Sequence, residues 1–238
     1  EKFTNIYLKF FISFLITLLI TLLLAAQPDI GQTLLVFFSW SVLIFISGIN
    51  IIFLISSGLI LCIVLYFSIT FFPKFAYIKN RISSFFNTET GTHNAQSEKA
   101  IESITSGGFF GKGIGEGTLK NRVPEAHTDY IISVISEEFG VIAIILILLL
   151  FLIFIYSVFK KVYFENEEKI KLILVGCVSL ILMQAMIHIG VNIRLFPTTG
   201  MTLPFISYGG SSMLSYALIF GTVICFSKNE ENSTYNPS

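Results

Sequence analysis

The residues best suited to chemistry are the two aspartates of the chain, Asp29 and Asp129, and the polar side chains around the second. Glu125 and His127 precede Asp129 in the run Pro-Glu-Ala-His-Thr-Asp-Tyr, directly before a long apolar stretch. Ionisable groups at such a place are costly to keep and often mark a functional site. Asp129 could act there as a general base, while Glu125 and His127 contact a substrate.

Helical spacing gives Asp129 a second interpretation. If a helix begins near Thr128, Asp129 shares a stripe with Ser133, Ser136 and Gly140, at positions i, i+4, i+7 and i+11. A polar stripe on a membrane helix favours contact with protein or a water-filled cleft. A carboxylate at a helix start can instead serve only that helix, stabilising it by about 0.3–1 kcal/mol. The pattern alone leaves capping and catalysis open.

Asp29 lies in Pro-Asp-Ile-Gly, in a short turn between two apolar runs. A structural role is the favoured interpretation, in which Asp29 caps the following helix. His188 lies inside another apolar run, and we interpret it as a buried, hydrogen-bonded histidine rather than a metal ligand.

Residues 195–212 carry two prolines, three glycines and seven hydroxyl side chains at the start of an apolar run. Broken helix at membrane depth is tolerated only where protein or water covers it. We therefore expect this segment to form a cavity wall. Ser207 and Tyr208 are the candidate substrate contacts, and Gly209 and Gly210 are expected to line the cavity.

The glycine-rich run over residues 106–117 does not match a phosphate loop, because Gly113 stands after Lys112 where a Ser or Thr is required. Two interpretations remain. The glycines permit a compact irregular loop, or the backbone approaches a ligand closely and Lys112 contacts a diphosphate.

Six apolar segments must position these residues. The chain is 54% hydrophobic and 13% charged, and a helix crosses a bilayer with about 20 apolar residues. The predicted fold is an all-α polytopic integral membrane protein in which residues 1–72 and 129–227 hold three spans each, separated by one large polar loop. The spans are residues 6–26, 33–48, 51–72, 131–159, 170–189 and 205–226, the loop is residues 73–128, and the tail is residues 228–238.

The net charge of zero gives no indication of a nucleic-acid partner. Lysines 160, 161, 169 and 171 bracket one short turn, which places that turn in the cytoplasm. Both aspartates and the loop 73–128 then face the outside. Seven basic residues in that loop oppose this orientation, although the rule weakens for long loops.

Three runs together resemble the SEDS family (shape, elongation, division and sporulation): residues 28–31, 106–140 and 201–212. Their order and spacing match over essentially the whole chain. Their residues are more similar to those of the division branch than to those of the elongation branch. Members have about ten spans, so the six here look like the C-terminal part of such a protein.

The resemblance implies a peptidoglycan glycosyltransferase of the bacterial inner membrane, which polymerises lipid II (undecaprenyl-diphosphate-linked disaccharide pentapeptide) on the extracytoplasmic face at the division septum. It also implies a class B penicillin-binding transpeptidase and other divisome proteins as partners. The essential loop aspartate of the family falls on Asp129. Charge on the leaving diphosphate would be met by Lys112, Arg122, Arg194, or a divalent cation such as Mg or Mn held with Glu125.

One position departs from the family pattern, because Thr199 stands where division members commonly have lysine. Two other functions remain open, a lipid II flippase and a non-catalytic scaffold for the transpeptidase. Transporters tend to place ionisable groups near the midplane and to show repeated halves. Here the acids lie at one surface and the two halves share no evident similarity, which favours the enzyme.

Overall fold

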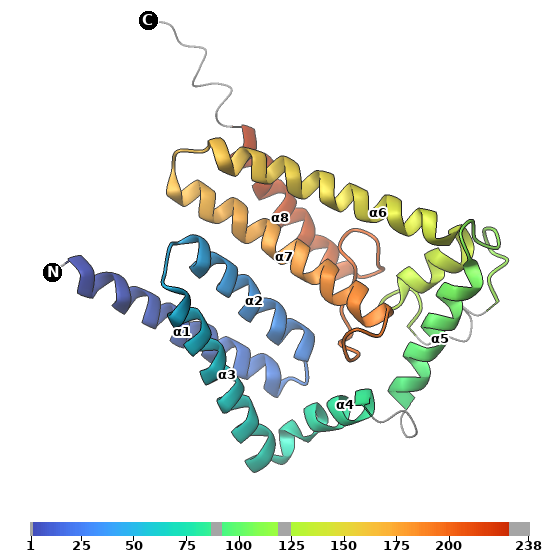
Figure 1. Ribbon diagram of the computed structural model, residues 1–238, viewed down its shortest axis with the longest axis horizontal. Coiled ribbons are helices and arrows are strands. Elements are labelled where there is room, and N and C mark those ends of the chain that lie inside the picture. The colour runs from blue at the N-terminus through green and yellow to red at the C-terminus, as the bar shows by residue number, and fades with distance from the viewer. Residues whose placement is uncertain (1, 87–91, 119–124, 229–238) are drawn as a thin grey trace, which may run out of the picture. The chain divides into compact units, whose positions relative to one another are not determined.

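The computed structural model describes residues 2–86, 92–118 and 125–228, which form helices joined by turns and irregular segments and contain no strand (Figure 1). The chain divides into two compact units, Glu1–Gly91 and Thr92–Ser238. The all-α class predicted from the sequence is confirmed.

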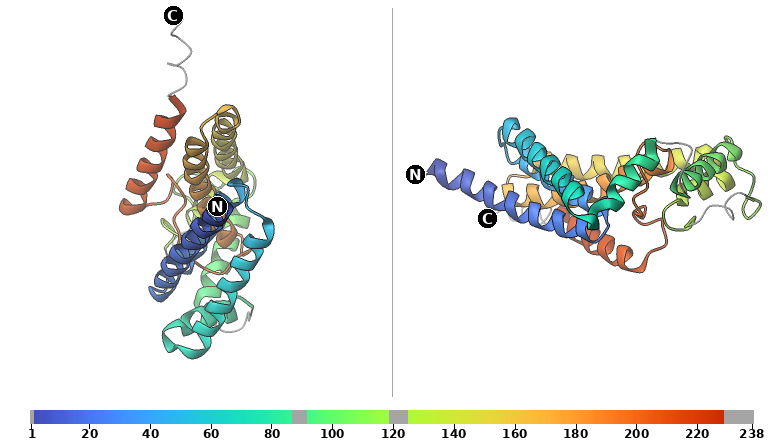
Figure 2. Two further views of the ribbon diagram at one scale, coloured as in Figure 1. Left: turned by 90° about the vertical axis from the view of Figure 1, so that its left-hand side faces the viewer. Right: turned by 90° about the horizontal axis from the view of Figure 1, so that it is seen from below.

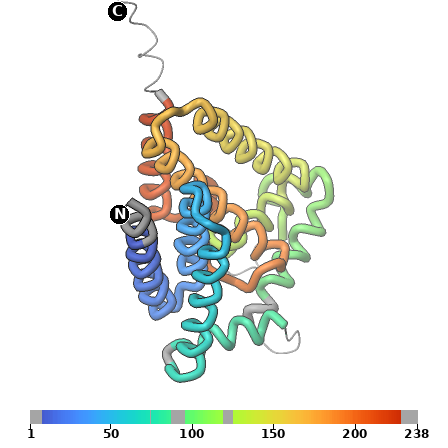
Figure 3. The backbone as a smooth tube through the Cα atoms, turned by 60° about the vertical axis from the view of Figure 1, so that its left-hand side comes forward, coloured from blue at the N-terminus to red at the C-terminus, as the bar shows by residue number. Residues whose placement is uncertain are grey.

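The first unit contains α1 (Lys2–Ala26), α2 (Ile30–Ile46), α3 (Ile51–Phe71) and α4 (Ala76–Phe86), with a short 3₁₀ turn before α4. Helices α1 and α2 pack side by side in opposite directions (Figure 3). Their apolar faces meet in a core with α3, because each helix is apolar around most of its surface. This core consists of Phe14, Phe37, Trp40, Ile44 and Leu61.

The second unit contains α5 (Thr92–Gly107), α6 (Ile131–Phe164), α7 (Glu168–Asn192) and α8 (Gly210–Lys228). Helices α6 and α7 run in opposite directions beside each other (Figure 2). Two apolar clusters hold this unit together. One consists of Val158, Leu174, Val178 and Val223, and the other consists of Ile132, Ala185 and Leu203.

Six apolar helices occupy the six predicted spans. In the described part of the chain, five of them are long and apolar enough to cross a membrane, and α2, with 17 residues, is shorter. The predicted start of the last span at residue 205 is wrong, because α8 begins at Gly210 and Phe205 has a φ of 65°. Residues before Gly210 are held by contacts to other segments instead.

The polar stretch 73–128, predicted as one large loop, contains α4 and α5. Both helices bury a narrow face: Ile78 of α4 is 7% exposed, and Ala100 and Ser103 of α5 are fully buried. A few apolar or small residues at helical spacing are enough to fold a segment that is polar on average. The extracytoplasmic location of this stretch stays a prediction, and the tail beyond Lys228 lies outside the described residues.

Candidate active site

Asp129 lies at the end of a tight turn directly before α6. The Asp129 and Thr128 N–H groups both donate to the Glu125 carbonyl, at 3.0 and 3.1 Å. The Thr128 hydroxyl also donates to Glu125 Oε2 at 3.0 Å. The Glu125 and His127 side chains are exposed, and Asp129 is partly buried. The turn therefore carries all three acidic or imidazole groups predicted for the site.

The Asp129 carboxylate faces a segment far along the chain. A Cβ built on Gly200 would lie 3.6 Å from Asp129 Oδ2. Gly200 has a φ of 71°, a conformation that favours glycine, so this residue presents only backbone to the carboxylate. The N-cap of α6 is Tyr130, whose side chain makes no capping hydrogen bond.

Two hydrogen bonds join the predicted cavity wall to the Asp129 turn. The Ser207 hydroxyl donates to the Thr128 carbonyl at 2.7 Å and accepts from the Leu203 N–H at 2.8 Å. The Tyr208 N–H donates to the His127 carbonyl at 3.0 Å. Ser207 is buried, and its hydroxyl holds the wall in place through these bonds. The substrate contact predicted for Ser207 stays a prediction.

Three polar side chains on one face of α7 support both segments. They are Gln184, His188 and Asn192, spaced four residues apart, and each is at most 6% exposed. Gln184 Nε2 donates to the Thr202 carbonyl at 3.0 Å, and His188 Nδ1 lies 2.7 Å from the Met201 carbonyl. These bonds hold the backbone that follows Gly200.

Asn192, the last of the three, reaches the Asp129 turn. Its Nδ2 donates to the Asp129 carbonyl at 3.0 Å and to the His188 carbonyl at 2.9 Å. Both partners can only accept, which fixes the orientation of the amide. His188 is buried and hydrogen-bonded, as its sequence position predicted. Gln184 and Asn192 were missed, although polar residues four apart in an apolar span were the available signal.

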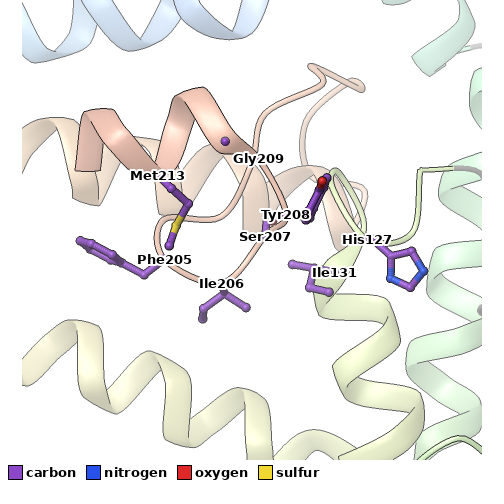
Figure 4. A pocket seen from close by; sticks show the side chains of 9 residues that line it. His127, Ile131, Phe205, Ile206, Ser207, Tyr208, Gly209 and Met213 are labelled. Atoms are coloured by element: carbon purple, nitrogen blue, oxygen red, sulfur yellow. The ribbon is translucent and has the colours of Figure 1, made fainter. Parts of the chain in front are cut away.

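An open pocket of about 510 Å³ lies beside these segments. Figure 4 shows Phe205, Ile206 and Ile131 along one side, Met213 and Gly209 along the other, and Tyr208 between Gly209 and Ile131. The Tyr208 side chain is 80% exposed and available for contacts. The lining residues are His127, Ile131, Phe205, Ile206, Ser207, Tyr208, Gly209, Gly210 and Met213. The predicted wall residues 207–210 and His127 thus share one pocket.

The polar stripe predicted along α6 faces α5 rather than a water-filled cleft. Ser133 and Ser136 are fully buried. The Ser136 hydroxyl donates to the Ile104 carbonyl, and the Ser103 hydroxyl donates to the Ser133 carbonyl, both at 3.2 Å. The stripe therefore packs the start of α6 against α5.

Lys112 contacts a buried carboxylate in this structure. Its Nζ lies 3.4 Å from Oε1 of Glu137, a residue with no exposed surface. The Thr118 N–H and the Ser103 hydroxyl also donate to the Glu137 carboxylate, at 2.9 and 3.2 Å. A buried charge that loses its partner is strongly destabilised. Lys112 is thus held by the protein, and its predicted diphosphate contact gains no support.

The glycine-rich run uses its backbone to pack on α6. The Lys112 and Gly113 N–H groups donate to the Glu137 and Glu138 carbonyls at 2.9 and 3.1 Å. At the kink of α6, Gly140 has a φ of 78°, and a Cβ there would collide with the Phe109 carbonyl. These contacts favour the interpretation of this run as a compact irregular loop.

The remaining predicted residues are dispersed. Arg194 pairs with Glu98, with Nη1 and Oε1 3.4 Å apart, and Arg122 lies outside the described residues. Asp29 belongs to the first unit, where its Oδ1 accepts from the Gln32 N–H at 2.9 Å and caps α2. The structural interpretation of Asp29 is therefore confirmed.

Tyr130 and Thr199 are the sequence neighbours of Asp129 and of Gly200, the residue that the Asp129 carboxylate faces. Burial raises the pKa of Tyr130 to about 12, and the negative charge of Asp129 adds to the shift. Thr199, in the position where lysine is common, is 6% exposed.

In the described residues, no group of three or more His, Cys, Asp or Glu side chains could hold a metal ion. The divalent cation stays a prediction.

Comparison with known proteins gives a consistent result. The family model for FtsW/RodA/SpoVE, described as cell cycle protein, matches residues 1–232. A probable peptidoglycan glycosyltransferase FtsW from Caulobacter vibrioides is 37% identical over 202 residues, covering 84% of this chain and 50% of the relative. A protein of the same name from Trichlorobacter lovleyi is 35% identical over 207 residues, covering 84% and 53%. The chain spans about half the length of these curated relatives.

Among solved structures, a chain with a similar fold comes from the structure described as "Structural coordination of polymerization and crosslinking by a peptidoglycan synthase complex". The TM-score is 0.72 at 25% identity, and the match covers 90% of this chain and 60% of the other.

Proposed function

The chain belongs to the FtsW/RodA/SpoVE family of cell cycle proteins, and from this premise we propose that it carries the active site of a peptidoglycan glycosyltransferase of bacterial cell division. Its substrate is lipid II, which it polymerises into glycan strands. The names of the relatives support the activity. The observation that carries the proposal is the position of the Asp129 carboxylate. Asp129 is partly buried and its carboxylate faces Gly200, and the open pocket lies in the same unit of the chain.

Asp129 is the general base of the proposed reaction. The 4-hydroxyl oxygen of the acceptor sugar forms a bond to the anomeric carbon of the donor. The bond from that carbon to the lipid diphosphate breaks, and the hydroxyl proton passes to Asp129. General base catalysis contributes typically about 10²–10⁴-fold, and the alignment of two lipid-anchored sugars supplies much of the remaining rate.

The leaving diphosphate is best placed in the pocket at the start of α8. Gly209 and Gly210 bring the first backbone N–H groups of that helix to the pocket, and His127 and the exposed Tyr208 line it too. A helix N-terminus attracts anions through its unpaired N–H groups and its dipole. Lys112 and Arg194 would have to exchange an ion pair for the diphosphate. Their binding roles, and that of a cation held by Glu125, remain predictions.

The proposed setting is the inner membrane at the septum, with Asp129 on the extracytoplasmic face. The five helices able to cross a membrane support a multi-pass protein. The partner is a class B penicillin-binding transpeptidase, because the similar structure is described as that of a peptidoglycan synthase complex in which polymerization and crosslinking are coordinated. Other divisome membrane proteins complete the proposal.

Labelled lipid II in vesicles separates the three candidate functions. The full-length protein is reconstituted with and without the transpeptidase, and both glycan products and the sidedness of the label are measured. We expect glycan strands from lipid II. Translocation of the label without strands would favour the flippase, and neither product would favour the scaffold.

A further inference from the structure

We propose that Asn192 is the positioning residue that holds Asp129 in place for catalysis. This inference rests on the proposed function, in which Asp129 is the base. Asn192 lies at the end of α7, has no exposed surface, and donates from Nδ2 to the Asp129 carbonyl at 3.0 Å. It touches the backbone of Asp129 and acts on the reaction only through that residue.

The amide of Asn192 is anchored at both of its hydrogens. The second hydrogen goes to the His188 carbonyl, 2.9 Å away and one turn earlier in the same helix. A side chain bonded to its own helix has little freedom to turn. The Asp129 carbonyl is therefore fixed relative to α7, a helix of 25 residues with many buried positions.

The same face of α7 also holds the segment opposite the carboxylate. His188 Nδ1 lies 2.7 Å from the carbonyl of Met201, the residue after Gly200. A Cβ on Gly200 would lie 3.6 Å from Asp129 Oδ2. One helix thus fixes the backbone that bears the carboxylate and the backbone that the carboxylate faces. The two contacts together fix how far apart these two backbone segments lie.

Positioning of this kind changes the rate constant rather than substrate affinity. A misplacement of about 1 Å at a reacting group can lower a rate by about 10²-fold. A purely structural role would instead lower the folded amount of protein and leave the kcat of folded molecules unchanged. The two roles are therefore separated by kcat and KM measured per folded protein.

The test uses Asn192→Leu in the full-length protein, reconstituted in vesicles with labelled lipid II. Leucine has a similar volume but neither hydrogen-bond donor. We expect kcat to fall about 10–100-fold, with KM within about two-fold of the wild type. The matched variant is Ser179→Ala, which removes another buried hydrogen-bond donor of α7, one that bonds the Gly176 carbonyl of its own helix at 2.9 Å and has no role in the proposed site. Its kcat should fall less than about three-fold.

Three outcomes decide the matter. A kcat of Asn192→Leu within two-fold of the wild type per folded protein would overturn the proposal, and so would a rise in KM alone. Equal losses of kcat in both variants would also overturn it. If Asn192→Leu does not fold, Asn192→Ala replaces it. Alanine also lacks the donor to the Asp129 carbonyl, so the same fall in kcat is expected, and a kcat within two-fold of the wild type per folded protein would contradict the proposal.

Asp129→Asn in the same assay distinguishes the two levels of failure. If Asp129→Asn polymerises lipid II like the wild type, the proposed base is wrong and the role of Asn192 fails with it. If Asp129→Asn is inactive while Asn192→Leu keeps its kcat, only the positioning role is wrong.

Discussion

The two aspartates occupy similar places in the sequence and different places in the structure. Each stands before an apolar helix. Asp29 serves that helix directly, because its carboxylate accepts the Gln32 N–H at 2.9 Å. The Asp129 carboxylate instead faces Gly200, 71 residues further along the chain. In the second unit the N-cap position falls to Tyr130, which makes no side-chain capping bond.

The two helix starts are held in place in different ways. At α2, the Asp29 side chain accepts one of the N–H groups at the helix start, that of Gln32. At α6, the start of the helix is held from outside, by Asn192 on the Asp129 carbonyl and by Ser207 on the Thr128 carbonyl. The Asp129 side chain then faces Gly200 of another segment, and the proposed function makes this carboxylate the general base.

The largest effect is expected when each aspartate is changed to asparagine in a separate variant. Asp129→Asn removes the proposed base, and we expect polymerisation of purified lipid II to fall about 10²–10⁴-fold. Asp29→Asn keeps a good N-cap and should leave the rate near the wild type. Both proteins are checked for folding by thermal unfolding in detergent. Similar rates for the two variants would abolish the functional distinction between the sites.

The variant Tyr130→Phe tests whether the buried Tyr130 side chain stabilises the start of α6. Its pKa is raised to about 12 by burial and the Asp129 charge, above the unfolded value of about 10. The resulting stability is fully present below pH 10 and is lost as the pH rises through 12. Two pKa units correspond to about 2–3 kcal/mol. Thermal unfolding at pH 9 and pH 11.5 should therefore show a larger fall for the wild type than for Tyr130→Phe. An equal fall in the two proteins would contradict this anchoring role.

Ser207→Ala tests the connection between the two segments of the site. It leaves the Leu203 N–H and the Thr128 carbonyl without their side-chain partner. Such a loss costs about 1–3 kcal/mol, so we expect a lower unfolding temperature together with a slower reaction. Ser211→Ala, at an exposed position in the first turn of α8, is the matched control. A Ser207→Ala protein as stable and active as this control would show that the connection is unimportant.

The smallest expected effect belongs to the capping aspartate itself. Asp29→Ala removes the bond to the Gln32 N–H and should lower the free energy of unfolding by about 1 kcal/mol. The measurement is thermal unfolding of the first unit within the full-length protein, followed by amide exchange at the start of α2. Lipid II polymerisation at a permissive temperature should stay unchanged. A large loss of activity would move Asp29 into the functional site.

Local pattern was sufficient for much of this protein. The length and apolar character of the runs predicted the six apolar helices, because a helix in lipid must satisfy its own backbone. The turn with Asp29 predicted a cap, since the acceptor and the N–H lie three residues apart. Residues 207–210 were predicted to line a cavity from their composition and place in the chain. For Asp129 the pattern left capping and catalysis open, and the family resemblance favoured catalysis.

How those parts meet depended on long-range packing. Lys112 was predicted to bind a diphosphate, yet it pairs with Glu137. Ser207 was predicted to contact substrate, yet it bonds the Thr128 carbonyl 79 residues away. Asn192 and Asp129 are separated by 63 residues. Helical periodicity reports neighbours within about four residues, so the pattern of the chain identified the apolar helices but not α4, α5 or any long-range contact. The partners of each buried polar group depended on how helices far apart in the chain pack, because each such group must find a hydrogen bond wherever packing places it.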